Sequence, residues 1–325
     1  MIKRIIEAYL KAKETYKTVP KAYKPSPMWR SFLTLRQPLI EAMNNRDEEA
    51  TTKLLSNLFR SSITAYTTFL RFWDAVRDDD QDGIDDLIAW GEYEIKAWKF
   101  YSDKDYKFDE LVLPQIGNPY GYTVNGIRIL PATPRYHYYS QKIKALLHGI
   151  DNPLVAEIGG GVGLMAYFLT RDSHIKYVEF DLPEVLATSQ YYLMSAFPDK
   201  KFLLYGEQPV DEINSCLINQ YDYILMPHFE LPKLADGIVD VFHNCHSLSE
   251  MDRETIDEYI KHIARTTNGY FYHENSGYGL VKVVGEFDEN SATQFNVPED
   301  KFVRLYMMKS IWGETVYYEY LYKKI

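Results

Sequence analysis

The sequence of 325 residues has few cysteines, no long apolar segment and no excess of positive charge. Its two cysteines, Cys216 and Cys245, exclude a disulfide framework and a cysteine-rich metal site. No stretch approaches the roughly 18 consecutive apolar residues that a membrane helix needs. The formal charge of −10 disfavours general binding to nucleic acid, because an acidic surface repels phosphate groups. We therefore expect a cytoplasmic protein with no membrane span and no nucleic-acid partner.

What the sequence does contain is an ordinary share of apolar residues, 46%, and an unusual number of tyrosines, 28. The apolar share excludes a disordered or fibrous chain, and the length suits one large domain or two modest ones. A tyrosine side chain combines a flat apolar face with a hydroxyl group. That combination suits sugars and other polyols, but it suits cores and interfaces equally well.

Residues 1–116 are predicted to form a helical N-terminal domain. Three segments repeat apolar residues at helical spacing: Met1–Lys17, Ala42–Phe72 and Asp85–Trp98. Met1–Lys17 also spreads charges among its apolar positions, which predicts an amphipathic helix and not a signal peptide. Residues 117–152 change to turn-forming residues followed by a predicted helix over Arg135–Leu147, and we expect them to connect two domains.

Residues 153–325 alternate predicted strands and helices. Five short apolar runs suit buried strands: Leu154–Ile158, Lys176–Phe180, Tyr221–Met226, Gly237–Phe242 and Gly269–His273. Helices are expected between them, near Gly163–Thr170, Pro183–Ala196 and Thr255–Ala264. This order predicts a mostly parallel sheet covered by helices, the α/β class. Two β-rich runs at the end, Val303–Ile311 and Thr315–Tyr322, predict an antiparallel hairpin at one sheet edge.

A glycine-rich loop follows the first predicted strand. The loop runs from Gly159 to Gly163, and the next strand ends on Asp181, about 20 residues further along the chain. Glycine permits positive φ and lets the backbone approach a ligand closely, and a following helix start offers free N–H groups. A carboxylate at the end of the second strand can accept both hydroxyls of a ribose. The order strand, loop, helix, strand and acid predicts a nucleoside-binding site.

Two nucleoside cofactors are compatible with this loop. The spacing of Gly161, Gly163 and Ala166 formally satisfies the dinucleotide fingerprint, so a NAD-dependent oxidoreductase is an alternative. Glu157 at the strand tip suits a cationic amino acid or sulfonium better than a pyrophosphate. No Lys-Ser or Lys-Thr follows the loop, which excludes an ATP-binding P-loop. S-adenosylmethionine is therefore the expected cofactor.

Several segments also resemble a known family. Glu157-x-Gly-x-Gly-x-Gly163 looks like motif I of the class I S-adenosylmethionine-dependent methyltransferases, and the final hairpin resembles their reversed last strand. Four segments together resemble the sugar O-methyltransferase family: Gly117–Gly121, Glu157–Gly161, Asp181–Leu193 and His246–Met251. The resemblance covers residues 117–275. It implies a Rossmann-like methyltransferase domain over residues 153–325 and methylation of a hydroxyl on a sugar or glycoconjugate.

The transfer of a methyl group to a sugar hydroxyl requires a base, because that hydroxyl does not ionise near pH 7. The loop around His246 resembles the loop that carries the general-base histidine of plant-type O-methyltransferases, and Glu274 matches their orienting glutamate. A carboxylate bonded to one imidazole nitrogen would fix the tautomer and raise the basicity of the ring. His243 and Glu250 are alternative bases. A small phenolic or natural-product acceptor would be served equally well by the same pair.

Further contacts are expected around the two ligands. The expected cofactor contacts are the residues at the strand ends: Glu157, Gly159, Gly160, Gly161, Gly163, Asp181, Leu182, His228 and Asn244. The expected contacts of a small-molecule or saccharide acceptor are polar or aromatic residues of the connecting segment: Asn118, Tyr120, Arg135, Tyr136 and Tyr139. Packing between domains would explain the latter set equally well. The helical domain is expected either to cover the substrate cleft or to form a homodimer interface.

No metal is expected. The candidate ligands are dispersed over different predicted elements and show no ligand spacing: Asp240, His243, His246, His273 and Glu274. Residues Asp78–Gly83 match the opening of a calcium loop, but Ala89 stands where that loop needs a bidentate glutamate. A solvated turn between helices explains this acidic segment better.

Overall fold

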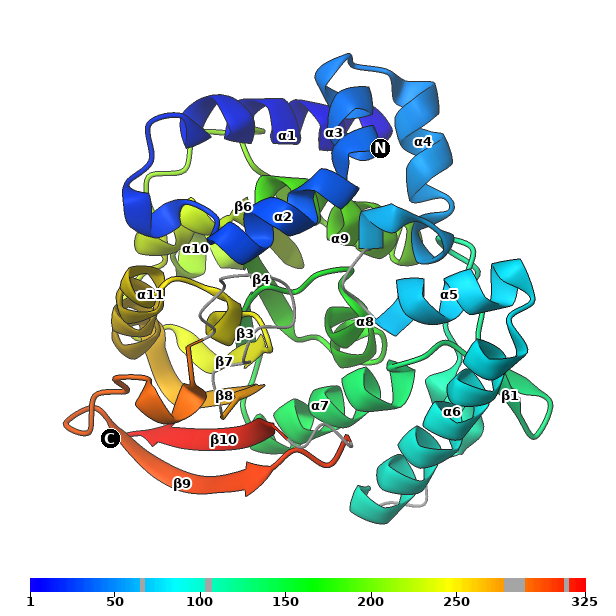
Figure 1. Ribbon diagram of the computed structural model, residues 1–325. Helices are drawn as coiled ribbons and strands as arrows, with labels where there is room; N and C mark the ends of the chain where they lie inside the picture. The colour runs from blue at the N-terminus through cyan, green and yellow to red at the C-terminus, as the bar shows by residue number, and fades with distance from the viewer. Residues whose placement is uncertain (65–67, 103–106, 278–289, 313–315) are drawn as a thin grey trace.

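The computed structural model describes residues 1–325 except 65–67, 103–106, 278–289 and 313–315 (Figure 1). Its centre is an eight-stranded sheet in the order β5-β6-β4-β3-β7-β8-β10-β9. The strands are β3 (Leu154–Ile158), β4 (Lys176–Asp181), β5 (Phe202–Leu204), β6 (Tyr223–Pro227), β7 (Val239–Cys245), β8 (Thr267–Ser276), β9 (Phe302–Lys309) and β10 (Tyr317–Lys324). The first six are parallel, whereas β10 is antiparallel to β8 and to β9. The α/β class and the antiparallel C-terminal hairpin are therefore confirmed.

Helices cover both faces of this sheet, because its strands are apolar on both sides. On β3, Val155 belongs to one apolar cluster, whereas Leu154 and Ala156 belong to another, as the alternation of a strand requires. The first cluster includes residues of α7 (Thr133–Leu146), α8 (Leu164–Thr170) and α9 (Pro183–Ala196). The second includes residues of α10 (Ser215–Ile218) and α11 (Arg253–Thr266).

The N-terminal part is helical, as predicted. Its helices are α1 (Ile2–Tyr16), α2 (Pro27–Leu35), α3 (Gln37–Asn44), α4 (Glu48–Leu55), α5 (Thr68–Asp78) and α6 (Gln81–Tyr101). In Figure 1, α1 to α4 gather at one end of the molecule, and α5 and α6 run along a side. Ile5, Leu39 and Trp98 share one apolar cluster with Val155 and Leu193, so the N-terminal helices and the sheet region pack into a common core.

The structure departs from the expected elements at two places, and it forms a short hairpin where Asn125-Gly126 indicates a turn. The helical run over Ala42–Phe72 is broken: Arg46 adopts a positive φ of 55°, and the Asp47 carboxylate caps α4 by accepting from Ala50 N at 2.8 Å. Strand β5 was not predicted from the sequence, because three residues are too few to show a period. Within the connecting segment, β1 (Tyr122–Val124) and β2 (Ile127–Ile129) form a separate antiparallel hairpin.

The sheet topology brings the predicted site residues to one edge. The chain passes from β3 to β4 in one direction and later returns to β7 on the other side of β3. Ligands of parallel α/β sheets bind at such a switch point, beyond the carboxyl ends of the strands. The register aligns Ile158 with Asn244 and Cys245 with Glu274, so the loops after β3 and β7 and the end of β8 are neighbours.

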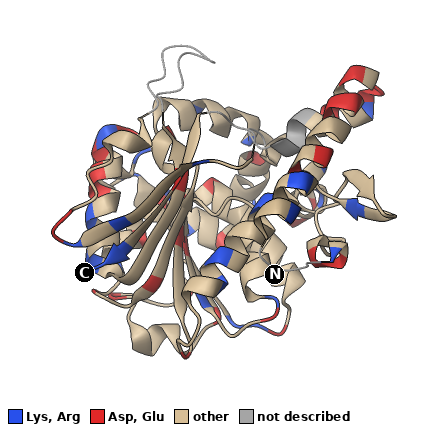
Figure 2. Cartoon of the chain, turned by 90° about the horizontal axis from the view of Figure 1, so that it is seen from below, with Lys and Arg blue, Asp and Glu red and all other residues tan. Residues whose placement is uncertain are grey.

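Charged residues are distributed unevenly over the elements. In Figure 2, Lys, Arg, Asp and Glu gather on the outer helices and loops, and the strands are largely tan with a few acidic bands. The buried acidic residues of the strands are Glu157, Glu179, Asp181, Glu274 and Glu319. Within the described part of the chain, no helix combines the length and the apolar character needed to cross a membrane.

Candidate active site

The glycine loop turns sharply at the end of β3. Gly159, Gly161 and Gly163 have φ values of +76°, +65° and +87°, which favour glycine. A Cβ atom at position 159 would lie 2.2 Å from Ser247 Oγ, so no larger residue fits there. A Cβ atom at position 161 would meet no heavy atom within 4 Å. The loop therefore packs closely on one side and borders open space at Gly161.

Asp181 stands at the end of β4, directly beside this loop. Its Oδ2 accepts from Gly161 N at 3.0 Å, and its Oδ1 accepts from Leu182 N at 2.7 Å. Burial raises the pKa of Asp181 to about 6, an effect opposed by these two backbone bonds and by the positive charge of Arg36. A carboxylate offers about four lone-pair positions, so two accepted bonds leave capacity for ribose hydroxyls.

Arg36, which the sequence analysis did not identify, is the cation nearest this acid. It connects α2 to α3, is only 4% exposed, and its Nη1 has no hydrogen-bond partner among the described residues. Burial lowers the pKa of Arg36 to about 10, and the charges of Asp181 and Glu184 oppose that effect. A lone arginine in a helical region is usually exposed, so only the packing of α2 and α3 could locate it here.

A small cavity lies beside Asp181. The sheet contributes Ile158, Gly159, Phe180, Asp181 and Leu182, and the N-terminal segment contributes Lys24, Pro25, Ser26 and Trp29. Its volume is about 40 Å³, whereas ligand pockets usually measure about 300–1,000 Å³. The segment is held down by Ser26 Oγ, which donates to the Glu250 carbonyl at 2.8 Å. The cavity as it stands is therefore too small to hold a whole nucleoside.

His228 also lines this cavity and is 5% exposed. Its Nε2 lies 2.8 Å from the Tyr23 carbonyl oxygen, and its Nδ1 lies 3.2 Å from the Asp181 carbonyl oxygen. Burial lowers the pKa of His228, and the two carbonyl contacts oppose that effect. The structure thus places His228 and Leu182 next to Asp181, while His228 also links the N-terminal segment to the sheet.

His246 and Glu274 meet at the same edge of the sheet. His246 Nε2 lies 3.0 Å from Glu274 Oε1, and His246 N donates to the Glu274 carbonyl at 2.7 Å. The glutamate side chain is 1% exposed and the histidine side chain 21% exposed. The imidazole stacks on Tyr317 with ring centroids 4.1 Å apart, and Ser310 Oγ donates to the same Oε1 at 3.1 Å. The histidine is oriented and remains partly accessible.

The two alternative bases differ from His246 in their surroundings. His243 is fully buried in β7, and its Nδ1 lies 3.0 Å from the Tyr272 carbonyl oxygen. Burial lowers the pKa of His243 to about 4, so this ring stays neutral near pH 7. Glu250 is half-buried, and its backbone carbonyl accepts from Ser26. Neither residue combines accessibility with an orienting carboxylate as His246 does.

Two buried glutamates lie behind the glycine loop. Glu157 accepts from the Tyr177 hydroxyl, and its Oε1 is 3.9 Å from His243 Nε2. Glu179, which the sequence analysis did not identify, accepts from Ser189 Oγ at 2.8 Å, and its carboxyl carbon would lie 2.8 Å from a Cβ atom on Gly160. Burial raises the pKa of both carboxyls, that of Glu157 to about 8. Glu157 is thus largely protonated at pH 7 in this structure.

The Glu157→Gln substitution is expected to reduce the loss of stability at high pH. Between pH 4.5 and about 8 the folded protein holds a proton on Glu157 that the unfolded chain releases, so stability falls as pH rises through this range. Glutamine removes that dependence. We expect the drop in unfolding free energy between pH 5.5 and 8.5, measured by urea titration, to shrink by about 2–4 kcal/mol. The exposed Glu92→Gln variant is the control, and an unchanged drop in Glu157→Gln would contradict the prediction.

Asn244 ties the ends of β3 and β7 together. Its Nδ2 donates to the Ile158 carbonyl at 2.8 Å, and its Oδ1 accepts from Asn275 Nδ2 at 2.8 Å. The side chain is fully buried. Asn244 therefore holds the strand ends in place from beneath the predicted cofactor position.

The predicted acceptor residues fall into two groups. On α7, Tyr139 lies with its ring 5.6 Å from that of His243, and the Arg135 guanidinium lies 6.0 Å from the Trp312 ring. Tyr136, on the same helix, is half-buried, and burial raises its pKa. Tyr139 thus lies beside β7 and Arg135 beside Trp312, which follows β9.

The remaining two, Asn118 and Tyr120, contact the helical part of the chain. Asn118 Nδ2 donates to Asn57 Oδ1 at 2.8 Å, and the Tyr120 ring lies 5.5 Å from Trp73. Both contacts join the connecting segment to the N-terminal helical part of the chain.

One cluster of potential metal ligands occurs among the described residues. Cys245, His246 and Glu274 offer ligand atoms that lie within 4.8 Å of one another. They are three donors, one short of the four that a structural zinc site uses. Asp240 and His273 lie elsewhere: Asp240 Oδ2 accepts from Leu154 N at 2.8 Å, and His273 is buried against Tyr320 with ring centroids 4.6 Å apart.

Comparisons with known proteins add little. No family model and no curated protein sequence matches the chain. Solved structures with a similar fold include the PH0226 protein from Pyrococcus horikoshii OT3, with 13% identity over 59% of this chain and 91% of that chain and a TM-score of 0.41. Another is a SAM dependent methyltransferase from Aquifex aeolicus, with 11% identity over 57% and 89% and a TM-score of 0.39.

A third structure is magnesium protoporphyrin IX methyltransferase from Synechocystis PCC 6803 with bound SAH. It has 12% identity over 71% of this chain and 92% of that chain, and a TM-score of 0.40. Identities and TM-scores this low do not indicate a function for this chain.

Proposed function

We propose that this protein transfers a methyl group from S-adenosylmethionine to a hydroxyl of a sugar or glycoconjugate. The observation that carries the proposal is the pairing of His246 Nε2 with Glu274 Oε1 at 3.0 Å. This pair lies at the ends of β7 and β8, on the sheet edge that also carries the glycine loop and Asp181. A base and a nucleoside-binding acid on one edge are the two parts that such a transfer requires.

The residues beside Asp181 fit the cofactor in their chemistry. The Asp181 carboxylate would accept the ribose hydroxyls, and the backbone at Gly161 borders open space. Leu182 and His228 line the adjoining cavity, whose lining would have to rearrange to hold a whole nucleoside. When bound, the cofactor supplies a methyl group that is already activated on a sulfonium, so the protein has to align the acceptor and remove its proton.

His246 is the proposed acceptor of that proton. Because Nε2 faces the Glu274 carboxylate, the neutral ring carries its proton there and its lone pair on Nδ1. As Nδ1 takes the hydroxyl proton, the buried carboxylate stabilises the imidazolium that forms. Arg135, Tyr136 and Tyr139 on α7 are the proposed contacts of the acceptor on the β7 side, and Asn118 and Tyr120 are weaker candidates because of their distant partners.

A methyl group added at Gly161 is expected to block the cofactor without unfolding the protein. The new Cβ would occupy the open space beside Asp181, where the nucleoside is proposed to lie. The control is Gly126→Ala in the β1–β2 turn, where φ is +79° and no heavy atom lies within 4 Å either. Both variants should lose about 1–2 kcal/mol of stability from the positive φ. Only Gly161→Ala should weaken binding of S-adenosylhomocysteine in calorimetry; equal affinities in the two variants would contradict the proposed position.

The function itself is tested by incubating the protein with S-adenosylmethionine and a panel of acceptors. The panel contains free sugars, nucleotide-linked sugars, oligosaccharides and simple phenols, and mass spectrometry detects the gain of one methyl group. Methylation of a sugar supports the proposal, whereas methylation of phenols alone would redirect it to a phenolic O-methyltransferase. Heat on mixing with NAD but none with S-adenosylmethionine would overturn it.

A further inference from the structure

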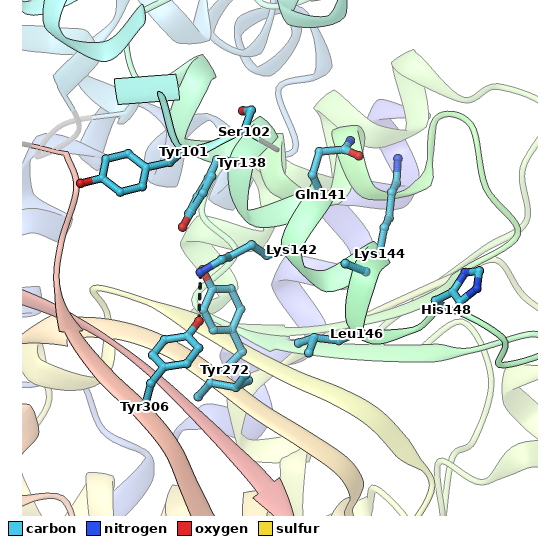
Figure 3. A pocket seen from close by; sticks show the side chains of 12 residues that line it. Tyr101, Ser102, Tyr138, Gln141, Lys142, Lys144, Leu146, His148, Tyr272 and Tyr306 are labelled. Carbon is cyan, nitrogen blue, oxygen red and sulfur yellow. Dashed lines mark hydrogen bonds between the residues drawn. The ribbon is translucent and has the colours of Figure 1, made fainter. Parts of the chain in front are cut away.

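A second, larger cavity lies beside α7 (Figure 3). Its volume is about 680 Å³, and it lies between α7, the end of α6 and the β8–β10–β9 part of the sheet. It shares no lining residue with the cavity beside Asp181. Four tyrosines line it: Tyr101, Tyr138, Tyr272 and Tyr306. This size accommodates one or two sugar rings, and the tyrosine rings give its walls several flat aromatic faces.

Lys142 projects into this cavity from α7 and is held by a buried acid. Its Nζ lies 2.5 Å from Glu319 Oε1 and donates to the Tyr306 hydroxyl at 3.0 Å. The Tyr306 hydroxyl in turn donates to Glu319 Oε1 at 2.6 Å. The Glu319 side chain is 1% exposed, so its charge needs a partner, and Lys142 supplies it. The ammonium uses two of its three N–H groups in these bonds.

The Lys142 ammonium also lies among three tyrosine rings of the lining, which together form an aromatic cage. Its Nζ lies 5.1, 5.9 and 5.0 Å from the ring centroids of Tyr138, Tyr272 and Tyr306. Figure 3 shows Lys142 pointing toward Tyr306 and away from Lys144. Because a cation of the protein already occupies the cage, a cationic ligand would be repelled from it.

An anionic ligand is disfavoured by the neighbouring charges. The charge of Lys142 is neutralised by Glu319, and Lys144, the other lysine of the lining, pairs with Asp172. The cavity therefore presents little net charge, together with hydroxyls, amides and aromatic faces. The Tyr272 hydroxyl is buried and has no hydrogen-bond partner among the described residues, which leaves one polar group of the floor unsatisfied.

We propose that this cavity binds a neutral saccharide, at a site distinct from the cavity beside Asp181. The apolar C–H face of a sugar ring packs on tyrosine rings, and Tyr101 at 43% exposure offers its ring at the mouth. Ring hydroxyls can accept the third N–H of Lys142 and exchange hydrogen bonds with Ser102 and Gln141. The inference rests on the chemistry of the cavity and does not require the proposed methyl transfer.

The test measures binding of three matched sets of methyl glycosides by saturation-transfer NMR, without cofactor. The sets are neutral hexosides (glucose, galactose and mannose, with cellobiose and maltose), the corresponding uronides, which are anionic, and the hexosaminides, which are cationic. We expect saturation transfer to at least one neutral glycoside, at least fivefold stronger than to its charged counterparts. No transfer to any neutral glycoside, or stronger transfer to a charged one, would overturn the inference.

Two variants locate the bound glycoside. Tyr101→Ala removes the ring at the mouth, and Ser102→Trp fills the mouth, and each should reduce the signal at least fivefold. Tyr93→Ala, on the same helix and with a similar exposure of 42%, should leave it unchanged. A signal that survives both mouth variants would place the sugar elsewhere and overturn the inference. Loss of methyl transfer with retained glycoside binding would count against the proposed function alone.

Discussion

Replacement of His246 by alanine is expected to lower kcat for methyl transfer by about 10²–10⁴-fold, the usual contribution of a general base. The affinity for S-adenosylmethionine should stay within about twofold, because His246 does not line the cavity beside Asp181. Its imidazole is instead bonded to Glu274 and stacked on Tyr317. Steady-state assays with saturating cofactor and acceptor measure the first quantity and calorimetry the second. The exposed His174→Ala variant is the control, with no expected change in either.

The Glu274→Gln substitution tests whether Glu274 acts by orienting the His246 ring or by its negative charge. Glutamine keeps the volume and one acceptor, but it no longer stabilises the imidazolium that forms as the hydroxyl loses its proton. We expect kcat to fall by roughly 10–100-fold, less than for His246→Ala. Full activity in His246→Ala would remove the histidine from the mechanism. A larger loss in Glu274→Gln than in His246→Ala would assign the buried carboxylate a different role.

Asp181→Asn is expected to raise the Kd for S-adenosylmethionine by roughly 10–150-fold, the equivalent of about 1.5–3 kcal/mol for hydrogen bonds to a charged group. The pKa of about 6 adds a pH dependence. Above pH 6 the carboxyl is ionised and would accept from both ribose hydroxyls, whereas below pH 6 it is protonated and would lose part of that capacity. Affinity of the natural protein should therefore fall as pH drops from 7 to 5, whereas that of Asp181→Asn should stay nearly flat.

Asp222→Asn is the matched control for this experiment. Asp222 immediately precedes β6, and its Oδ2 accepts from Lys201 N at 2.8 Å, so it also binds backbone beside a parallel strand, but it does not line the cavity. Its substitution should leave cofactor affinity and the pH profile unchanged. A Kd in Asp181→Asn equal to that in Asp222→Asn would show that no ribose sits at Asp181.

Much of the sheet could be predicted from the sequence because its signals are local. The strand Leu154–Ile158 and the helix Pro183–Ala196 lie where the apolar runs and Pro183 indicated. The hairpin at the C-terminus was visible as two β-rich runs, and it forms with β10 against β8. The N-terminal helical run was harder, because the turn at Arg46 and the cap at Asp47 interrupt it without changing its apolar period.

In the candidate site, too, the local features could be predicted from the sequence, whereas the contacts between distant residues could not be predicted from local patterns. The sequence by itself determined the order of strand, glycine loop, helix and acid that brings Gly161 N within 3.0 Å of Asp181, since this geometry is built within about 20 residues. The pairing of His246 with Glu274 across two paired strands was expected only from the family resemblance, and no local pattern predicted it. Only the tertiary structure decided that Arg36 lies buried near Asp181. It also decided that the segment around Trp29 narrows the cavity. Those contacts join residues far apart in the chain, and burial, charge and available space depend on every neighbour that packs around them.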